Sequence, residues 1–203
     1  MNKEFTRGYL WELKKAIDAL PLEKFEEIFS LILEASKAGR QIFIMGNGGS
    51  GATASHFACD MNKGAHSGSK KPFKVICLND NMPTLLAIAN DGSFKDIFVE
   101  QLKNFLKPGD LVVGLSSSGN SENILRAIGY ANKNGAKTIG LTGLEGGKLA
   151  KRAHFALVVP AKDPQKVEDI HLVLVHLIKQ NINRKRLSQK SQPRTRAGAP
   201  SRR

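Results

Sequence analysis

Apolar residues recur every three or four positions along the first part of the chain, which is the spacing of an amphipathic helix. One such stretch covers residues 3–20 and a second covers residues 22–38. Pro21 separates the two stretches, and Gly39 follows the second, where a glycine commonly ends a helix. We therefore expect an N-terminal helical hairpin. Its apolar faces are too wide to cap one sheet alone, so we expect these helices to pair between subunits.

The pattern then changes to short, continuous apolar runs, which are typical of strands buried in a parallel sheet. The five runs are residues 41–45, 73–78, 111–115, 138–141 and 155–159. The helical stretches between and after them are residues 51–63, 94–106, 121–134 and 165–182. Strands that alternate with helices predict an α/β fold with helices on both faces of the sheet. We predict a doubly wound, five-stranded parallel sheet within one domain, residues 1–182.

Positive charge is concentrated near the C-terminal end. The 203 residues carry a formal net charge of +13, and the segment from Arg184 to Arg203 holds eight Lys and Arg and no acidic residue. Leu187 is its one large apolar residue, so the segment cannot bury enough surface to offset its chain entropy. We predict a disordered basic tail, residues 183–203. The remaining +5 gives no reason to expect that the body binds nucleic acid, while the tail could contact nucleic acid or simply be solvated.

The sequence shows neither a membrane-spanning segment nor a signal peptide. No apolar run approaches the ~20 residues that cross a bilayer, and the first fifteen residues lack the apolar core of a signal peptide. Cys59 and Cys77 form neither a CxxC motif nor a disulfide framework, which fits a reducing compartment. We expect a cytoplasmic protein without a membrane partner.

Small polar residues follow three of the predicted strands. Residues 46–51 read GNGGSG, residues 116–121 read SSSGNS, and a glycine-rich turn occupies residues 141–147. Glycines let the backbone approach an anion, and hydroxyl groups and helix N-termini donate hydrogen bonds to it. Each turn alone could simply cap a helix. Because the carboxyl ends of parallel strands meet at one edge, three such turns predict a sugar-phosphate or related anion site.

Two predicted helices carry histidine together with carboxylates. His56 and Asp60 lie one turn apart in the first helix, and Glu168 and His176 lie eight residues apart in the last helix. An ordinary ion pair on a helix surface is one interpretation of the first pair. Two such helices beside a phosphate site instead favour proton transfer next to a carbonyl group, or metal binding.

Taken together, these motifs resemble the sugar isomerase (SIS) domain family and, within it, the phosphoheptose isomerases. The resemblance covers roughly residues 5–182, and its motifs are GNGGSxxxxxHFA, AND, SxSGNSxN, LTGxxGG and DIHLVLVH. It implies a flavodoxin-like strand order, a homotetramer, and isomerisation of sedoheptulose 7-phosphate to D-glycero-D-manno-heptose 7-phosphate in heptose biosynthesis. By position, the phosphate-binding residues would be Ser50, Ser116, Ser117, Ser118 and Ser121, and Gly48 would also contact the substrate. Asn47 and Asp91 match family residues that contact the sugar.

The resemblance also suggests roles for the ionisable residues. His176 matches the catalytic histidine, and His56 matches a residue that binds zinc in some members. Asp60 stands where the family has its glutamate base, and Glu168, also expected to contact substrate, stands where glutamine is common. We expect Asp60 or Glu168 to act as the base and His176 as the acid or second base. The expected Zn²⁺ ligands are His56, Asp60, Glu168 and His176.

Two alternatives remain open at this stage. The shorter Asp60 side chain and the basic tail would also suit a non-catalytic relative, such as the family member that associates with the replication initiator DnaA. An isomerase of another sugar phosphate is the other alternative. Lys63 is the nearest substitute for a basic sugar-site residue of the family. We expect the sites to lie at subunit interfaces, where His176 would serve the phosphate loop of a neighbour.

Overall fold

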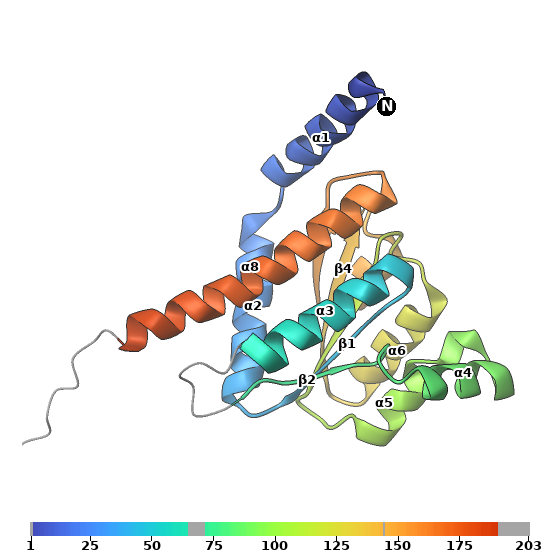
Figure 1. The fold of residues 1–203 in the computed structure, drawn as a ribbon. Coiled ribbons are helices and arrows are strands. Elements are labelled where there is room, and N and C mark those ends of the chain that lie inside the picture. Colours follow the sequence, from blue (N-terminus) through green and yellow to red (C-terminus); the bar gives the residue numbers. More distant parts are fainter. Residues whose placement is uncertain (1, 65–71, 144, 191–203) are drawn as a thin grey trace, which may run out of the picture.

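The computed structural model describes residues 2–64, 72–143 and 145–190. Its centre is a five-stranded parallel sheet with the strand order β2-β1-β3-β4-β5 (Figure 1). The strands are β1 (Gln41–Gly46), β2 (Lys74–Cys77), β3 (Leu111–Ser116), β4 (Lys137–Gly143) and β5 (Phe155–Val159). Every strand pairs with its neighbours in parallel. The predicted doubly wound α/β sheet and its flavodoxin-like order are confirmed.

Helices cover both faces of this sheet. They are α1 (Lys3–Asp18), α2 (Leu22–Lys37), α3 (Gly48–Gly64), α4 (Met82–Asp91), α5 (Val99–Phe105), α6 (Glu122–Lys133), α7 (Gly147–Arg152) and α8 (Pro164–Lys190). Successive side chains of a strand point to opposite faces. Ile42 and Ile44 of β1 therefore join the core beneath α2, α3 and α8, whereas Phe43 and Met45 join the core beneath α4 to α7. As a result, α3 and α8 pack against each other on one face of the sheet.

Two helices lie where the apolar pattern predicted none. In α4, Met82 and Leu86 are exposed, so apolar side chains are not confined to one stripe. The other helix, α7, begins inside the glycine-rich turn, which hides it from a search for periodicity. The predicted helix 94–106 is divided into a short 3₁₀ helix, η1 (Phe94–Asp96), and α5.

The last helix is longer than predicted. It continues to Lys190, so the expectation of disorder is wrong for residues 183–190. Lysine, arginine, leucine and glutamine all have high helix propensity, which favours extension of a helix already anchored to the sheet. The rest of the predicted tail, residues 191–203, lies outside the described residues. Among the helices described, none combines the length and the apolar character needed to cross a bilayer.

Both predicted N-terminal helices are present. In Figure 1, α1 runs on beyond α2 and projects away from the sheet, so the pair does not fold back as a hairpin. Ala16 is the one residue of α1 that is buried. Three contacts tie α1 to α8: the Tyr9 hydroxyl donates to Asp169 at 2.7 Å, Lys166 pairs with Glu12 at 2.5 Å, and Lys166 Nζ lies 4.6 Å from the centre of the Tyr9 ring. Most of the apolar surface of α1 therefore has no cover within one subunit.

Candidate active site

A pocket of about 400 Å³ lies at the carboxyl edge of the sheet. The turns after β1 and β3 form it, together with the start of α8. Its lining residues are Asn47, Ser50, Leu115, Ser116, Ser117, Ser118, Ser121, Lys162, Pro164 and Glu168. The structure thus brings together all five serines that the sequence suggested as phosphate ligands. Gly48 does not line the pocket; its φ of +51° lets the chain turn sharply from β1 into α3.

The serine-rich turn is held by its own hydroxyl groups and by the turn after β4. The Ser116 hydroxyl lies 3.1 Å from that of Ser121 and 3.5 Å from that of Ser118. Gly119 has a φ of +64°, and a Cβ there would overlap the Gly146 backbone. The Leu149 N–H also donates to the Gly119 carbonyl oxygen at 2.8 Å. The third predicted turn therefore supports the serine loop instead of lining the pocket.

Two asparagines join the turns after β1 and β3. The Asn47 amide nitrogen donates to Asn123 Oδ1 at 2.9 Å, and the Asn123 amide nitrogen donates to Asn47 Oδ1 at 2.8 Å. Asn123 is 2% exposed, so this exchange takes place largely away from solvent. Asn123 lies in the sequence motif SxSGNSxN, but sequence reasoning assigned no role to it. The amide pair fixes the spacing of the two loops that line the pocket.

Glu168 lies in this pocket. Its Oε1 accepts hydrogen bonds from the Ser50 hydroxyl at 3.3 Å and from the Ser117 hydroxyl at 3.5 Å. A Cβ at Gly49 would overlap the Glu168 carboxylate, which would then have to shift from its place beside the serines. The carboxylate therefore occupies hydroxyl donors that would otherwise face an anion.

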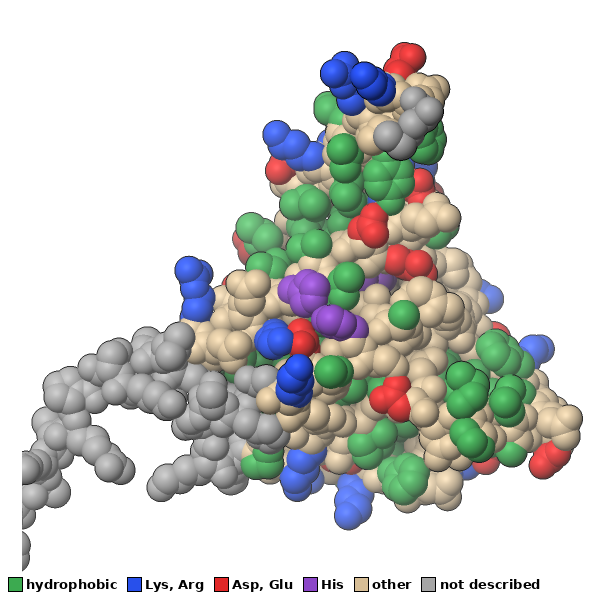
Figure 2. Space-filling view, in the orientation of Figure 1, with side chains coloured by type: hydrophobic (Ala, Val, Ile, Leu, Met, Phe, Trp, Pro, Cys, Tyr) green, Lys and Arg blue, Asp and Glu red, His purple; other side chains and the backbone are tan. Residues whose placement is uncertain are grey.

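A second polar cluster lies farther along the same two helices. His56 Nε2 on α3 and His176 Nε2 on α8 are 2.9 Å apart, with the rings edge to face. The Asp60 Oδ2 atom lies 3.5 Å from His56 Nε2. One Nε2 must carry a proton, because a hydrogen bond between two imidazoles needs one donor and one acceptor. Figure 2 shows histidine side chains together on the surface of this face.

The histidine–aspartate cluster could hold a metal ion. His56, Asp60 and His176 each offer one ligand atom, and these three atoms lie within 4.8 Å of one another. Two imidazole nitrogens and a carboxylate oxygen form a donor set that Zn²⁺ accepts. Glu168, the fourth residue expected, is not in this group of described residues and lies in the serine pocket instead.

Lys179 reaches the cluster although sequence reasoning missed it. Its Nζ donates to Asp60 Oδ1 at 2.5 Å. Lys179 follows His176 by three residues, and this helical spacing is the one signal that could have pointed to it. Lys63, the basic residue considered before, is exposed in the last turn of α3. Asp91 is also exposed, accepts a hydrogen bond from Asn90, and does not line the pocket.

Comparisons with known proteins agree with this architecture. The sequence pattern of one family, described as SIS domain, matches residues 8–143. The phosphoheptose isomerase of Aquifex aeolicus is 35% identical over 82% of this chain and 87% of its own length. That of Aliarcobacter butzleri is 37% identical over 84% and 89%. The solved structure of phosphoheptose isomerase from Neisseria gonorrhoeae superposes with a TM-score of 0.83 at 29% identity, covering 90% of this chain and 98% of that one.

Proposed function

The chain belongs to the SIS-domain family and to its phosphoheptose isomerases, and we propose that it converts sedoheptulose 7-phosphate to D-glycero-D-manno-heptose 7-phosphate. This is an aldose–ketose isomerisation, and it belongs to heptose biosynthesis. The observation that carries the proposal is the placement of two sites along one pair of helices. A serine-lined pocket lies at their N-terminal ends, and a histidine–aspartate cluster lies farther along both.

The spacing of the two sites suits a long sugar phosphate. Ser50 and His56 are six residues apart on α3, or about 9 Å along the helix axis. Glu168 and His176 are eight residues apart on α8, or about 12 Å. In extended sedoheptulose 7-phosphate, phosphorus and C2 are separated by about 9 Å, given carbon–carbon bonds of about 1.5 Å. A phosphate held by the serines would thus leave C1 and C2 near the histidine pair.

The reaction requires one proton to leave carbon and one to return. Removing a proton from C1, next to the C2 carbonyl, gives an enediolate, and adding a proton at C2 gives the aldose. We propose that Asp60 removes the proton from C1 and returns it at C2. His176 transfers the hydroxyl proton from O1 to O2. The serine pocket holds the phosphate and so orients the reacting carbons. No oxidant or reductant is consumed.

We also propose that His56, Asp60 and His176 bind Zn²⁺. Three protein ligands with an open fourth position are typical of catalytic zinc. A bound zinc ion supplies polarisation of the substrate oxygens. In this proposal Glu168 is not a zinc ligand. It lies beside the bound sugar phosphate, in the pocket where it contacts Ser50 and Ser117.

The proposed assembly is a cytoplasmic homotetramer. Its support is the uncovered apolar surface at the N-terminal end, where Phe5, Trp11 and Leu22 are each more than 60% exposed. Contiguous exposed apolar surface commonly marks a protein–protein interface. Light scattering on the purified protein tests this part of the proposal, and a monomer would contradict it.

Turnover of sedoheptulose 7-phosphate tests the activity itself. The purified tetramer is assayed for aldose after chelation and again after zinc is restored, with fructose 6-phosphate and ribulose 5-phosphate as alternative substrates. We expect the seven-carbon substrate to react, and to react faster with zinc. Turnover of a shorter sugar phosphate alone would favour the other-isomerase alternative. Folded tetramer without any turnover, but with binding to initiator protein, would favour the non-catalytic one.

A further inference from the structure

Lys179 and Asp60 form the one ion pair between described residues that involves the histidine cluster and a lysine or arginine. They lie 119 positions apart in the sequence, on α8 and α3. The Asp60 side chain is 12% exposed and that of Lys179 is 30% exposed. Shielding a carboxylate from water costs free energy unless a hydrogen-bonded partner compensates it. Lys179 provides that partner.

The carboxylate divides its two oxygens between two neighbours. Oδ1 accepts from Lys179 Nζ at 2.5 Å, and Oδ2 lies 3.5 Å from His56 Nε2. A contact at one oxygen fixes the rotation of the carboxylate and therefore the direction of the other oxygen. Outer hydrogen-bond partners commonly orient ligands and catalytic groups in this way.

We propose that Lys179 is a positioning residue, which holds Asp60 so that its Oδ2 faces the two histidines. The expected effect of Lys179 on turnover rests on the proposed isomerase function, whereas its expected effect on metal binding does not. An aspartate is one methylene shorter than a glutamate, so its carboxylate ends about 1–1.5 Å farther back. Precise orientation by Lys179 makes this short side chain effective at the cluster.

Two other roles for Lys179 predict different results. A purely structural link between α3 and α8 would affect stability and leave the turnover of folded enzyme unchanged. An ammonium group that acts mainly by repelling a metal ion would, on removal, give tighter zinc binding. A positioning lysine gives the opposite: slower turnover and weaker zinc binding when it is removed.

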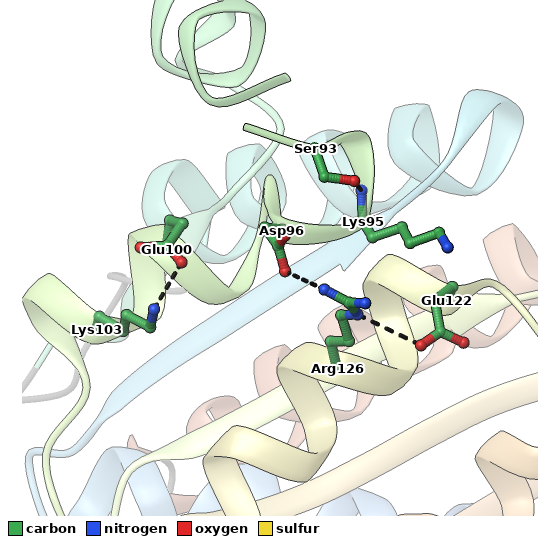
Figure 3. A network of polar contacts seen from close by, with 7 residues as sticks. All are labelled: Ser93, Lys95, Asp96, Glu100, Lys103, Glu122 and Arg126. Carbon is green, nitrogen blue, oxygen red and sulfur yellow. Dashed lines mark hydrogen bonds and ion pairs between the residues drawn. The ribbon is translucent and has the colours of Figure 1, made fainter. Parts of the chain in front are cut away.

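The experiment combines Lys179→Met, Lys179→Arg and Asp60→Glu in the full chain. Lys103→Met is the matched control, because Lys103 pairs with Glu100 at 2.6 Å on an exposed helix face (Figure 3). Steady-state kcat and KM are measured with sedoheptulose 7-phosphate, and zinc affinity is measured by competition with a chromogenic chelator. Circular dichroism checks folding, and Lys179→Gln replaces Lys179→Met if that variant is unfolded.

We expect Lys179→Met to lower kcat by roughly 10–100-fold with KM little changed, and to weaken zinc binding about tenfold. Lys179→Arg should recover most of both losses, and Lys103→Met should show neither. In the Asp60→Glu background, loss of Lys179 should cost less, because the longer carboxylate reaches the cluster unaided.

Other results would overturn the proposal. They are unchanged kcat in folded Lys179→Met with normal zinc affinity, tighter zinc binding in that variant, or an equal loss in both Asp60 backgrounds. If the unaltered protein has no turnover, the proposed function fails, and the zinc titrations still decide the role of Lys179.

Discussion

His171 is buried in α8, five residues before His176, with 0% of its surface exposed. Burial lowers the pKa of this imidazole from 6.5 to about 4, and the Thr142 backbone beside it only partly opposes the shift. The folded state therefore holds a neutral ring, whereas the unfolded chain takes up a proton below pH 6.5. The folded state is stabilised in full above pH 6.5 and loses that stability as the pH falls towards 4. A difference of about 2.5 pKa units corresponds to about 3 kcal/mol.

Urea unfolding measures this effect at one protein concentration, at pH 7.5, 5.5 and 4.5. The original protein is compared with His171→Leu, which removes the titrating ring and keeps a side chain of similar size. We expect the free energy of unfolding to fall by about 2.5 kcal/mol more in the original protein than in the variant between pH 7.5 and 4.5. Equal losses in the two proteins would refute the reasoning, since His171 would then bind its proton equally in both states.

Three further predictions concern the pocket and the N-terminal helix. Asn123→Ala should raise KM for the sugar phosphate about tenfold by releasing Asn47, and an unchanged KM in steady-state assays would contradict this role. Glu168→Gln should bind inorganic phosphate about tenfold more tightly, because a negative charge leaves the pocket; calorimetry showing equal or weaker binding would argue against that placement. Trp11→Glu should reduce the proposed tetramer to smaller species in light scattering, and an unchanged oligomer would show that this part of α1 lies outside the interface.

Much of the fold could be predicted because its pattern is local. Each strand is a short apolar run, and β1, β3 and β4 end in glycine or serine, which marks the position of the turn that follows. Helix α4 was not predicted, because its apolar residues are not confined to one stripe. Helix α8 is longer than predicted, because charged residues with high helix propensity continue a helix that already packs against the core.

The site could be predicted only in part. The serines lie at strand ends, and parallel strands necessarily bring those ends together, so their convergence follows from the sheet. His56 and Asp60 are one turn apart, which local spacing shows. Lys179 meets Asp60 only because α3 packs against α8, and no local pattern reports which faces of two distant helices meet. The same limit applies to Glu168, whose spacing from His176 did not reveal that it turns into the serine pocket.

The proposed reaction is tested most directly by incubating the zinc-loaded protein with sedoheptulose 7-phosphate in D₂O and following the product by NMR. We expect the aldose heptose 7-phosphate to carry solvent deuterium at C2, because the proton removed from C1 passes through a group that exchanges with water. His176→Asn should slow its formation by at least about 100-fold. Folded protein that forms no aldose would contradict the proposed isomerase, and aldose without deuterium at C2 would contradict proton transfer through a group that exchanges with water.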